Sequence, residues 1–136
     1  MADNPLFEGI EDRGVHKHLG IRVVEAQPDR VVLELDVTDK THQPFGLLHG
    51  GVSALLAESA ASMGAALSVG QGQTVVGIEI NASHLRGVSE GMITATATPI
   101  RKGRSIHVWH IGVVDHLQRA ICDARCTLAV VSAPQG

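Results

Sequence analysis

One ionisable side chain interrupts the longest weakly polar segment of the chain. Between Gly50 and Gly70, Glu58 is the only residue that carries a charge. The Ala and Leu content of this segment predicts a buried helix, in which a carboxylate is costly unless it is paired, hydrogen-bonded or used in chemistry. An ionised carboxylate can attack a carbonyl carbon or take a proton from water. Glu58 is therefore the first catalytic candidate, and a structural ion pair at an interface is the alternative explanation.

Serine residues of the same segment offer a partner for Glu58. Ser62 follows it by four residues, so the two side chains share a helix face and the hydroxyl can contact the carboxylate or a bound water. Taken alone, Ser62 is equally explained as a small residue that allows close packing. Ser53 and Ser59 lie outside any Gly-x-Ser-x-Gly elbow, which argues against a serine hydrolase.

The residues that lead into this helix suggest an oxyanion site. The stretch is QPFGLLHGG, from Gln43 to Gly51. Glycines at a helix start let a ligand approach backbone N–H groups, which carry the positive end of the helix dipole. Such groups stabilise an oxyanion that develops on a thioester or carboxyl oxygen, and Gln43 can add a neutral donor. A tight loop-to-helix turn would also explain Gly50 and Gly51.

The eight histidines do not form a recognisable metal motif. No pair has a zinc spacing such as His-Glu-x-x-His, and His107 and His110 fall on opposite faces of a predicted strand. We expect His49 to shape the loop by hydrogen bonding, with substrate contact as a lesser alternative. No metal and no cofactor is expected.

A basic cluster offers partners for phosphate groups. Arg101, Lys102 and Arg104 surround a predicted turn, and Arg86 follows an earlier strand. The phosphates of a carrier such as coenzyme A could bind these side chains, although a solvated hairpin turn explains them as well. No Walker or Gly-x-Gly-x-x-Gly signature supports a nucleotide-hydrolysing or dinucleotide-binding role.

The length and composition limit the number of domains and the classes of function that the chain can have. A chain of 136 residues is long enough for one domain, and a net charge of −3 argues against a nucleic-acid binder. The acidic N-terminus lacks a signal-peptide pattern, and the serines of the 50–70 segment make it a poor membrane span. Cys122 and Cys126 are expected to be reduced core thiols, which favours a cytoplasmic protein.

The elements that must position these residues follow from periodicity and turn residues. Residues 6–18 are weakly predicted as a short helix, and a loop is predicted at 39–48. Strands with one buried face surround the helix predicted at 50–69, in the order strand, strand, helix and four strands. Those strands are predicted at residues 21–25, 31–37, 73–85, 91–99, 105–115 and 119–131. This order indicates an α+β fold in which an antiparallel sheet wraps around one long central helix, with a second subunit covering edges.

Two segments resemble a known family. QPFGLLHGGVSALLAESAAS, from Gln43 to Ser62, and VVGIEINASHLRGVSEG, from Val75 to Gly91, are similar to the hotdog-fold acyl-CoA thioesterases of the PaaI-like type. The resemblance spans about His18 to Val131 and is strongest to the aryl branch, which includes dihydroxynaphthoyl-CoA and enterobactin-proofreading thioesterases. It implies a single hotdog domain over 1–136, with a short N-terminal segment, 1–18, before a core at about 19–131.

The resemblance also implies roles. Glu58 would attack the thioester or activate water, the Gly50 N–H would bind the oxyanion, and Gln43 would polarise the carbonyl. Ser62 would help to place the water or the carboxylate. In this branch Gln43 and Gly50 face Glu58 and Ser62 from a partner subunit, so a homo-oligomer is implied, with a dimer of dimers expected. Residues near the CoA nucleotide would be His84, Arg86, Gly103, Arg104 and Ser105.

Glu58 also bears on the acyl group. Many phenylacetyl-CoA-type relatives carry Asp at this position, so Glu favours an aromatic acyl-CoA substrate. Two alternatives remain open at this point. A hotdog dehydratase or hydratase would use His49 beside Glu58, and a non-catalytic acyl-CoA-binding protein would bind without turnover.

Overall fold

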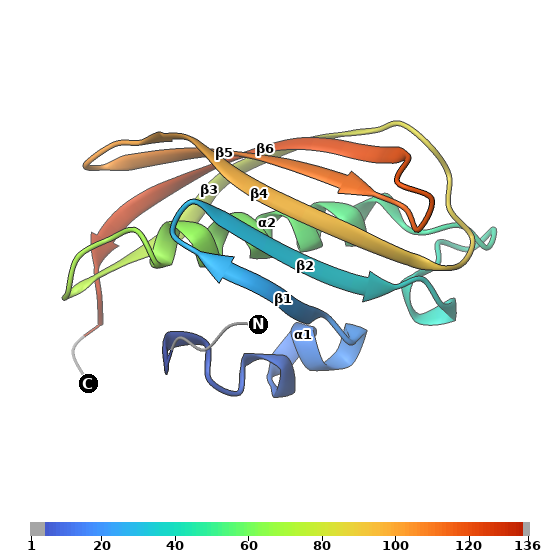
Figure 1. Ribbon diagram of the computed structural model, residues 1–136, viewed down its shortest axis with the longest axis horizontal. Helices are drawn as coiled ribbons and strands as arrows, with labels where there is room; N and C mark the ends of the chain where they lie inside the picture. The colour runs from blue at the N-terminus through green and yellow to red at the C-terminus, as the bar shows by residue number, and fades with distance from the viewer. Residues whose placement is uncertain (1–4, 135–136) are drawn as a thin grey trace.

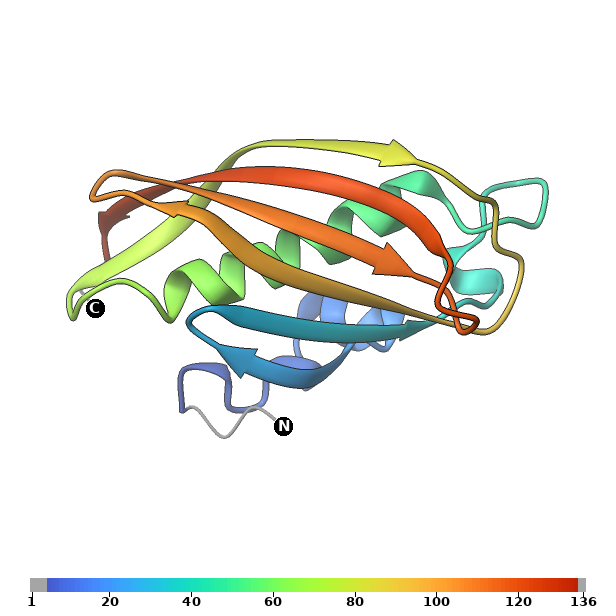
Figure 2. The same ribbon diagram turned by 45° about the horizontal axis from the view of Figure 1, so that its top comes forward.

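A curved sheet wrapped around one helix forms the body of the molecule (Figure 1, Figure 2). The computed structural model describes residues 5–134. Its six strands have the order β1-β2-β4-β5-β6-β3, and every neighbouring pair is antiparallel. The regular elements are α1 (Gly14–Leu19), β1 (Arg22–Gln27), β2 (Arg30–Asp36), α2 (Gly50–Ala66), β3 (Gln73–His84), β4 (Met92–Lys102), β5 (Ile106–Val114) and β6 (Ala120–Ser132), with short 3-10 turns at Pro5–Phe7, Ile10–Asp12 and Asp39–Thr41. The predicted α+β hotdog architecture is confirmed.

Small side chains let α2 lie close to the sheet. Ala57, Ala60 and Ala61 are fully buried on its sheet-facing side. At Gly64 a Cβ atom would collide with the ring of Trp109, so this glycine makes room for the largest side chain of the core. Because α2 sits so deep in the curve of the sheet, a polar group on it is held in a fixed place relative to the strands.

The strand alternation predicted for residues 31–37 is confirmed. Val31, Leu33 and Leu35 on β2 are fully buried. The β1–β2 hairpin turns at Pro28 and Asp29.

Several predicted boundaries differ from those of the structure, among them the end of α2 and the segment of residues 6–18. The helix predicted to reach Val69 ends at Ala66, because the Ser68 hydroxyl donates its one proton to the carbonyl of Gly64 or to that of Pro28 and so offers this turn an alternative to helical hydrogen bonds. Residues 6–18 form two 3-10 turns and the start of α1 instead of one helix. Gly9 and Gly14 have φ angles of 73° and 53°, and this left-handed backbone interrupts helical geometry.

β3 forms one edge of the sheet. It pairs with β6 on one side only, and a bulge interrupts that pairing between Gly77 and Glu79. Val76 and Ile78 on this strand are 50% and 57% exposed. A long edge strand with exposed apolar side chains is a surface that proteins normally cover.

Both cysteines are free thiols in the core. Burial raises the pKa of both thiols. For Cys126 the carboxylates of Glu58 and Glu79 add to this effect, and its pKa reaches about 12. No helix in the described part of the chain has the length and apolarity to cross a membrane.

We predict that the native protein does not react with Ellman's reagent at neutral pH. The thiolate is the reactive form, and burial suppresses both its formation and its access to the reagent. Guanidinium should expose both thiols, which absorbance of the released thionitrobenzoate would count. Rapid reaction of either thiol in the native state would contradict the burial.

Candidate active site

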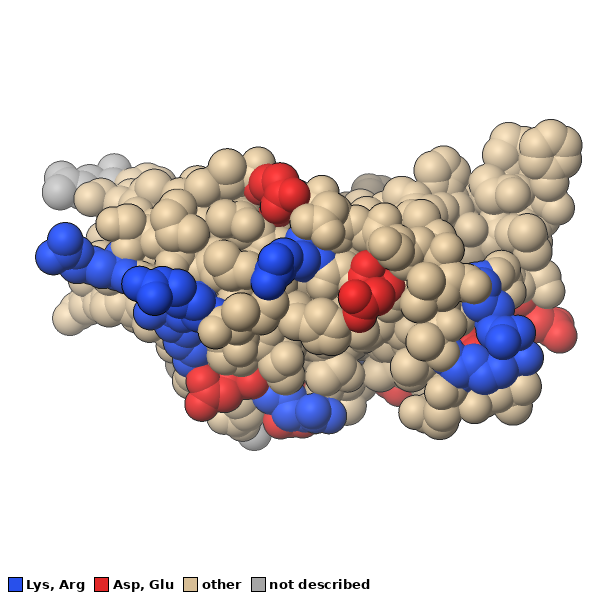
Figure 3. Space-filling model, turned by 90° about the horizontal axis from the view of Figure 1, so that it is seen from above, with Lys and Arg blue, Asp and Glu red and all other residues tan. Residues whose placement is uncertain are grey.

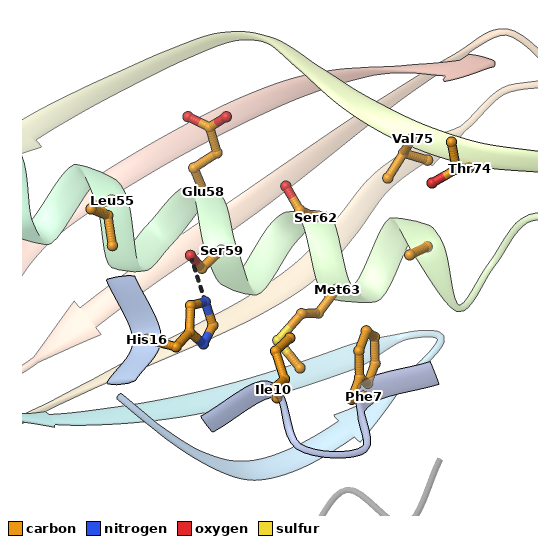
Figure 4. A pocket seen from close by; sticks show the side chains of 11 residues that line it. Phe7, Ile10, His16, Leu55, Glu58, Ser59, Ser62, Met63, Thr74 and Val75 are labelled. Carbon is orange, nitrogen blue, oxygen red and sulfur yellow. Dashed lines mark hydrogen bonds between the residues drawn. The ribbon is translucent and has the colours of Figure 1, made fainter. Parts of the chain in front are cut away.

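The carboxylate of Glu58 points from the middle of α2 toward β3 (Figure 4). Its Oε2 atom lies so close to Gly77 that a Cβ atom there would overlap it. Gly77 is also the residue at which the β3 bulge begins. The glycine of the VVGIEIN segment therefore provides the space in which the carboxylate sits, because any side chain at this position would occupy it.

A cavity of about 410 Å³ opens beside Glu58. Glu58 and Ser62 point the same way into it from successive turns of α2, as their spacing predicted (Figure 4). The lining residues are Phe7, Ile10, His16, Leu55, Glu58, Ser59, Ser62, Met63, Ala66, Thr74 and Val75. Most of this wall is apolar, so the cavity suits a hydrophobic group attached to a reacting centre at Glu58.

Sequence reasoning missed one wall of this cavity. Phe7, Ile10 and His16 come from the N-terminal segment, which the sequence analysis placed outside the core. Phe7 is buried and belongs to the hydrophobic core. The short turns of this segment have no long apolar repeat, so periodicity gave no signal for them.

A second cavity, of about 420 Å³, lies at the start of α2 and includes Gln43, Gly50, His84 and Arg86. The Oε1 atom of Gln43 accepts hydrogen bonds from the backbone N–H groups of Phe45 and Leu47. Because the oxygen is used to hold the loop, the amide Nε2 is the end of Gln43 that is left to donate to a ligand.

Gly50 allows an imidazole ring to lie against the helix start. A Cβ atom at this position would be 2.7 Å from Nε2 of His84. His49 caps the helix, since its Nδ1 atom accepts from the Gly51 N–H at 2.8 Å and its carbonyl accepts from Val52. This cap is a hydrogen bond of the loop-shaping kind expected of His49, and the N–H of Gly50 is a first-turn donor that the cap does not use.

The residues predicted near the CoA nucleotide divide between two places. His84 and Arg86 line the second cavity, at the end of β3. Gly103 and Arg104 line another cavity together with Gln73, the first residue of β3. The carbonyl of Ser105 accepts from the Val130 N–H beside them. Lys and Arg side chains gather at this end of the molecule, the left end in Figure 3.

Glu58 and Gly50 are too far apart to act on one carbonyl within a single chain. Eight residues of helix separate them along α2, about 12 Å at the rise of an α-helix. A reacting carbon must lie about 3 Å from both the nucleophile and the oxyanion donors. The structure therefore groups Glu58 with Ser62, and Gln43 with Gly50, in separate cavities.

His107 and His110 lie on opposite faces of β5, as their spacing predicted. His107 is buried and its Nδ1 accepts from the Trp109 ring N–H, whereas His110 is partly buried and pairs with Asp123. Over residues 5–134, no three His, Cys, Asp or Glu side chains are grouped in a way that could hold a metal ion.

Comparison with known proteins decides the family. The pattern that defines the thioesterase superfamily matches residues 45–122. The chain belongs to the thioesterase superfamily. The predicted fold and the predicted class of enzyme, a thioester hydrolase, are confirmed by this match together with the relatives that follow.

Three relatives show how similar this thioesterase is to proteins of known structure or name. The 1,4-dihydroxy-2-naphthoyl-CoA hydrolase of Listeria monocytogenes is 48% identical over 117 residues, which cover 86% of this chain and 95% of that protein. The proofreading thioesterase EntH of Cronobacter turicensis is 44% identical, with 85% and 84% covered. The crystal structure of thioesterase HI1161 from Haemophilus influenzae superposes with a TM-score of 0.88 at 41% identity, covering 93% of this chain and 88% of that one.

We predict that Gly77→Ala lowers thioesterase activity at least about tenfold, because the new methyl group displaces the Glu58 carboxylate from its place on β3. Gly112→Ala is the matched control. Gly112 also lies in a strand, and a Cβ atom there would meet its nearest neighbour at an ordinary contact distance of 3.7 Å. Initial rates of thiol release would measure the effect, and circular dichroism would confirm folding. Wild-type activity in folded Gly77→Ala would show that the close approach of the Glu58 carboxylate to Gly77 is not required for activity.

Proposed function

We propose that this thioesterase hydrolyses acyl-CoA thioesters, prefers an aromatic acyl group, and uses Glu58 as the catalytic carboxylate. The observation that carries the proposal is the position of Glu58, half-buried against Gly77 at the wall of a largely apolar cavity. The name of the Listeria relative, a 1,4-dihydroxy-2-naphthoyl-CoA hydrolase, supports an aromatic acyl group.

The chemistry begins at the thioester carbonyl carbon. In one route the Glu58 carboxylate attacks this carbon, CoA leaves as a thiolate, and water then hydrolyses the mixed anhydride to release the acid and restore Glu58. In the other route Glu58 takes a proton from water and the hydroxide attacks the same carbon; the C–S bond then breaks, and CoA leaves as the thiol with the proton that Glu58 returns. In both routes the carbonyl oxygen becomes negative and receives hydrogen bonds from the Gly50 N–H and the Gln43 amide.

The two halves of this site come from two copies of the chain. β3 is an edge strand, and antiparallel pairing with a second β3 would cover its exposed edge. Such a pairing lays the His84 end of one strand against the Gln73 end of the other. Gln43 and Gly50, which lie at the His84 end, would then approach Glu58 of the second copy, whose carboxylate rests on the middle of β3.

The same pairing unites the residues assigned to CoA. His84 and Arg86 of one copy would approach the basic turn of the other, around Gly103, Arg104 and Ser105. Guanidinium groups there would bind the phosphates of CoA. A dimer of dimers and a cytoplasmic location, which the free thiols favour, complete the proposal.

The hydratase or dehydratase alternative is less well supported. It needs His49 as a proton-transfer group beside Glu58. The Nδ1 atom of His49 is instead engaged in capping α2. Turnover of an acyl-CoA distinguishes the enzyme from the alternative, a protein that binds acyl-CoA without hydrolysing it.

The test is free-thiol release from a panel of aryl- and alkyl-CoA thioesters. Wild type should turn over aryl-CoA fastest, and Glu58→Gln should lose at least about 100-fold in kcat, since it can neither attack nor accept a proton. Glu90→Gln is the matched control, because Glu90 is an exposed carboxylate outside β3 and outside both cavities and should leave the rate unchanged.

Each contrary result points elsewhere. Turnover confined to alkyl-CoA would overturn the aryl assignment. Equal rates in Glu58→Gln and wild type would remove the role of Glu58. CoA-thioester binding without any release of thiol would favour the binding protein.

A further inference from the structure

A second polar pair lines the cavity beside Glu58. The Nε2 atom of His16, on α1, lies 3.2 Å from the hydroxyl oxygen of Ser59 on α2. Both side chains line the cavity. Successive residues of a helix point about 100° apart, so Ser59 faces the N-terminal segment while Glu58 faces β3. Figure 4 shows this division, with His16 and Ser59 on one side of the helix and Glu58 and Ser62 on the other.

The surroundings of this pair are apolar. Ile10, Leu55 and Met63 line the same cavity. The Nδ1 atom of His16 is buried and has no hydrogen-bond partner within residues 5–134. A buried imidazole nitrogen without a partner costs free energy, and an apolar side chain would close this wall without that cost. Closing the wall therefore does not account for a histidine here.

Burial favours the neutral form of the His16 imidazole. Burial lowers the pKa of His16, and the carboxylate of Glu11 opposes this only in part. A neutral imidazole has one donor and one acceptor nitrogen, and no partner at Nδ1 fixes which is which. The His16–Ser59 hydrogen bond can therefore run in either direction, so that the Ser59 hydroxyl can either donate to or accept from a ligand.

We propose that His16 and Ser59 form a polar subsite of the acyl cavity that selects acyl groups bearing a neutral hydrogen-bonding substituent, a hydroxyl above all. The inference rests on the proposed function and goes beyond it, because it names the substituent of the acyl group that the cavity recognises. An aromatic ring would lie among the apolar side chains, with its thioester at Glu58 and its hydroxyl on Ser59. A charged substituent is disfavoured, since the neutral pair offers no compensating charge.

The experiment compares benzoyl-CoA with the three monohydroxybenzoyl-CoA isomers in wild type and in His16→Leu. In wild type, kcat/KM for at least one hydroxylated isomer should exceed that for benzoyl-CoA by about tenfold, the value of one good hydrogen bond. In His16→Leu this ratio should fall to near one. His18→Leu makes the same change at an exposed position of α1 and should keep the wild-type ratio.

Two further measurements keep a structural effect apart from a specificity effect. His16→Gln restores a neutral hydrogen-bonding group and should recover part of the ratio. His16→Leu and Ser59→Ala should be non-additive in the ratio, because each breaks the same pair. Ratios that stay at the wild-type value in His16→Leu would overturn the subsite.

Binding of thioether analogues separates this proposal from the proposed function. Calorimetry with phenacyl-CoA and its hydroxylated analogues needs no turnover. A hydroxyl preference in Kd that His16→Leu abolishes supports the subsite even if no thioester is hydrolysed. Equal Kd values for all analogues in wild type would overturn it even if benzoyl-CoA is hydrolysed rapidly.

Discussion

The structure depends on one close approach, that of the Glu58 carboxylate to the backbone of β3. A carboxylate in the middle of an apolar helix must have a place that the surrounding elements leave for it. Gly77 leaves that place by having no side chain, and the bulge beside it bends the strand around the carboxylate. The small residues of α2, together with Gly64 over Trp109, keep the helix close enough to the sheet for this contact to form.

This arrangement separates the tasks of catalysis along the helix. The middle of α2 holds the carboxylate and the largely apolar cavity that we propose for the acyl group. The start of α2 holds the proposed oxyanion donors, where His49 accepts from the Gly51 N–H and Gln43 holds its own loop through its side-chain oxygen. In the proposed mechanism neither half completes the reaction alone, so the exposed edge of β3 would serve both as an interface and as part of the catalytic site.

Much of the fold and of the candidate site was predictable, because short stretches of the sequence encode it. The alternation of apolar and polar residues predicted the strands. Glu58 was recognisable as a candidate because its neighbours in the sequence are apolar and small. The glycines around His49 marked the helix start. Other features depend on contacts between distant segments. The hydrogen bond from Ser68 that ends α2 early goes to Gly64 or Pro28, and the wall formed by Phe7 and His16 depends on how the N-terminal turns fold back. The separation of His84 from Gly103 follows from the length and path of β3, which no short motif records.

Mixing two inactive variants tests the central claim, that Glu58 acts with Gln43 and Gly50 of a second copy. Glu58→Gln and Gln43→Ala, each carrying a different affinity tag, would be refolded together, and co-purification of the tags would verify subunit exchange. If the site is shared, each mixed dimer holds one intact site, so random exchange should restore about a quarter of wild-type activity. If exchange occurs and the mixture stays as inactive as the separate variants, the site lies within one chain and the account is wrong.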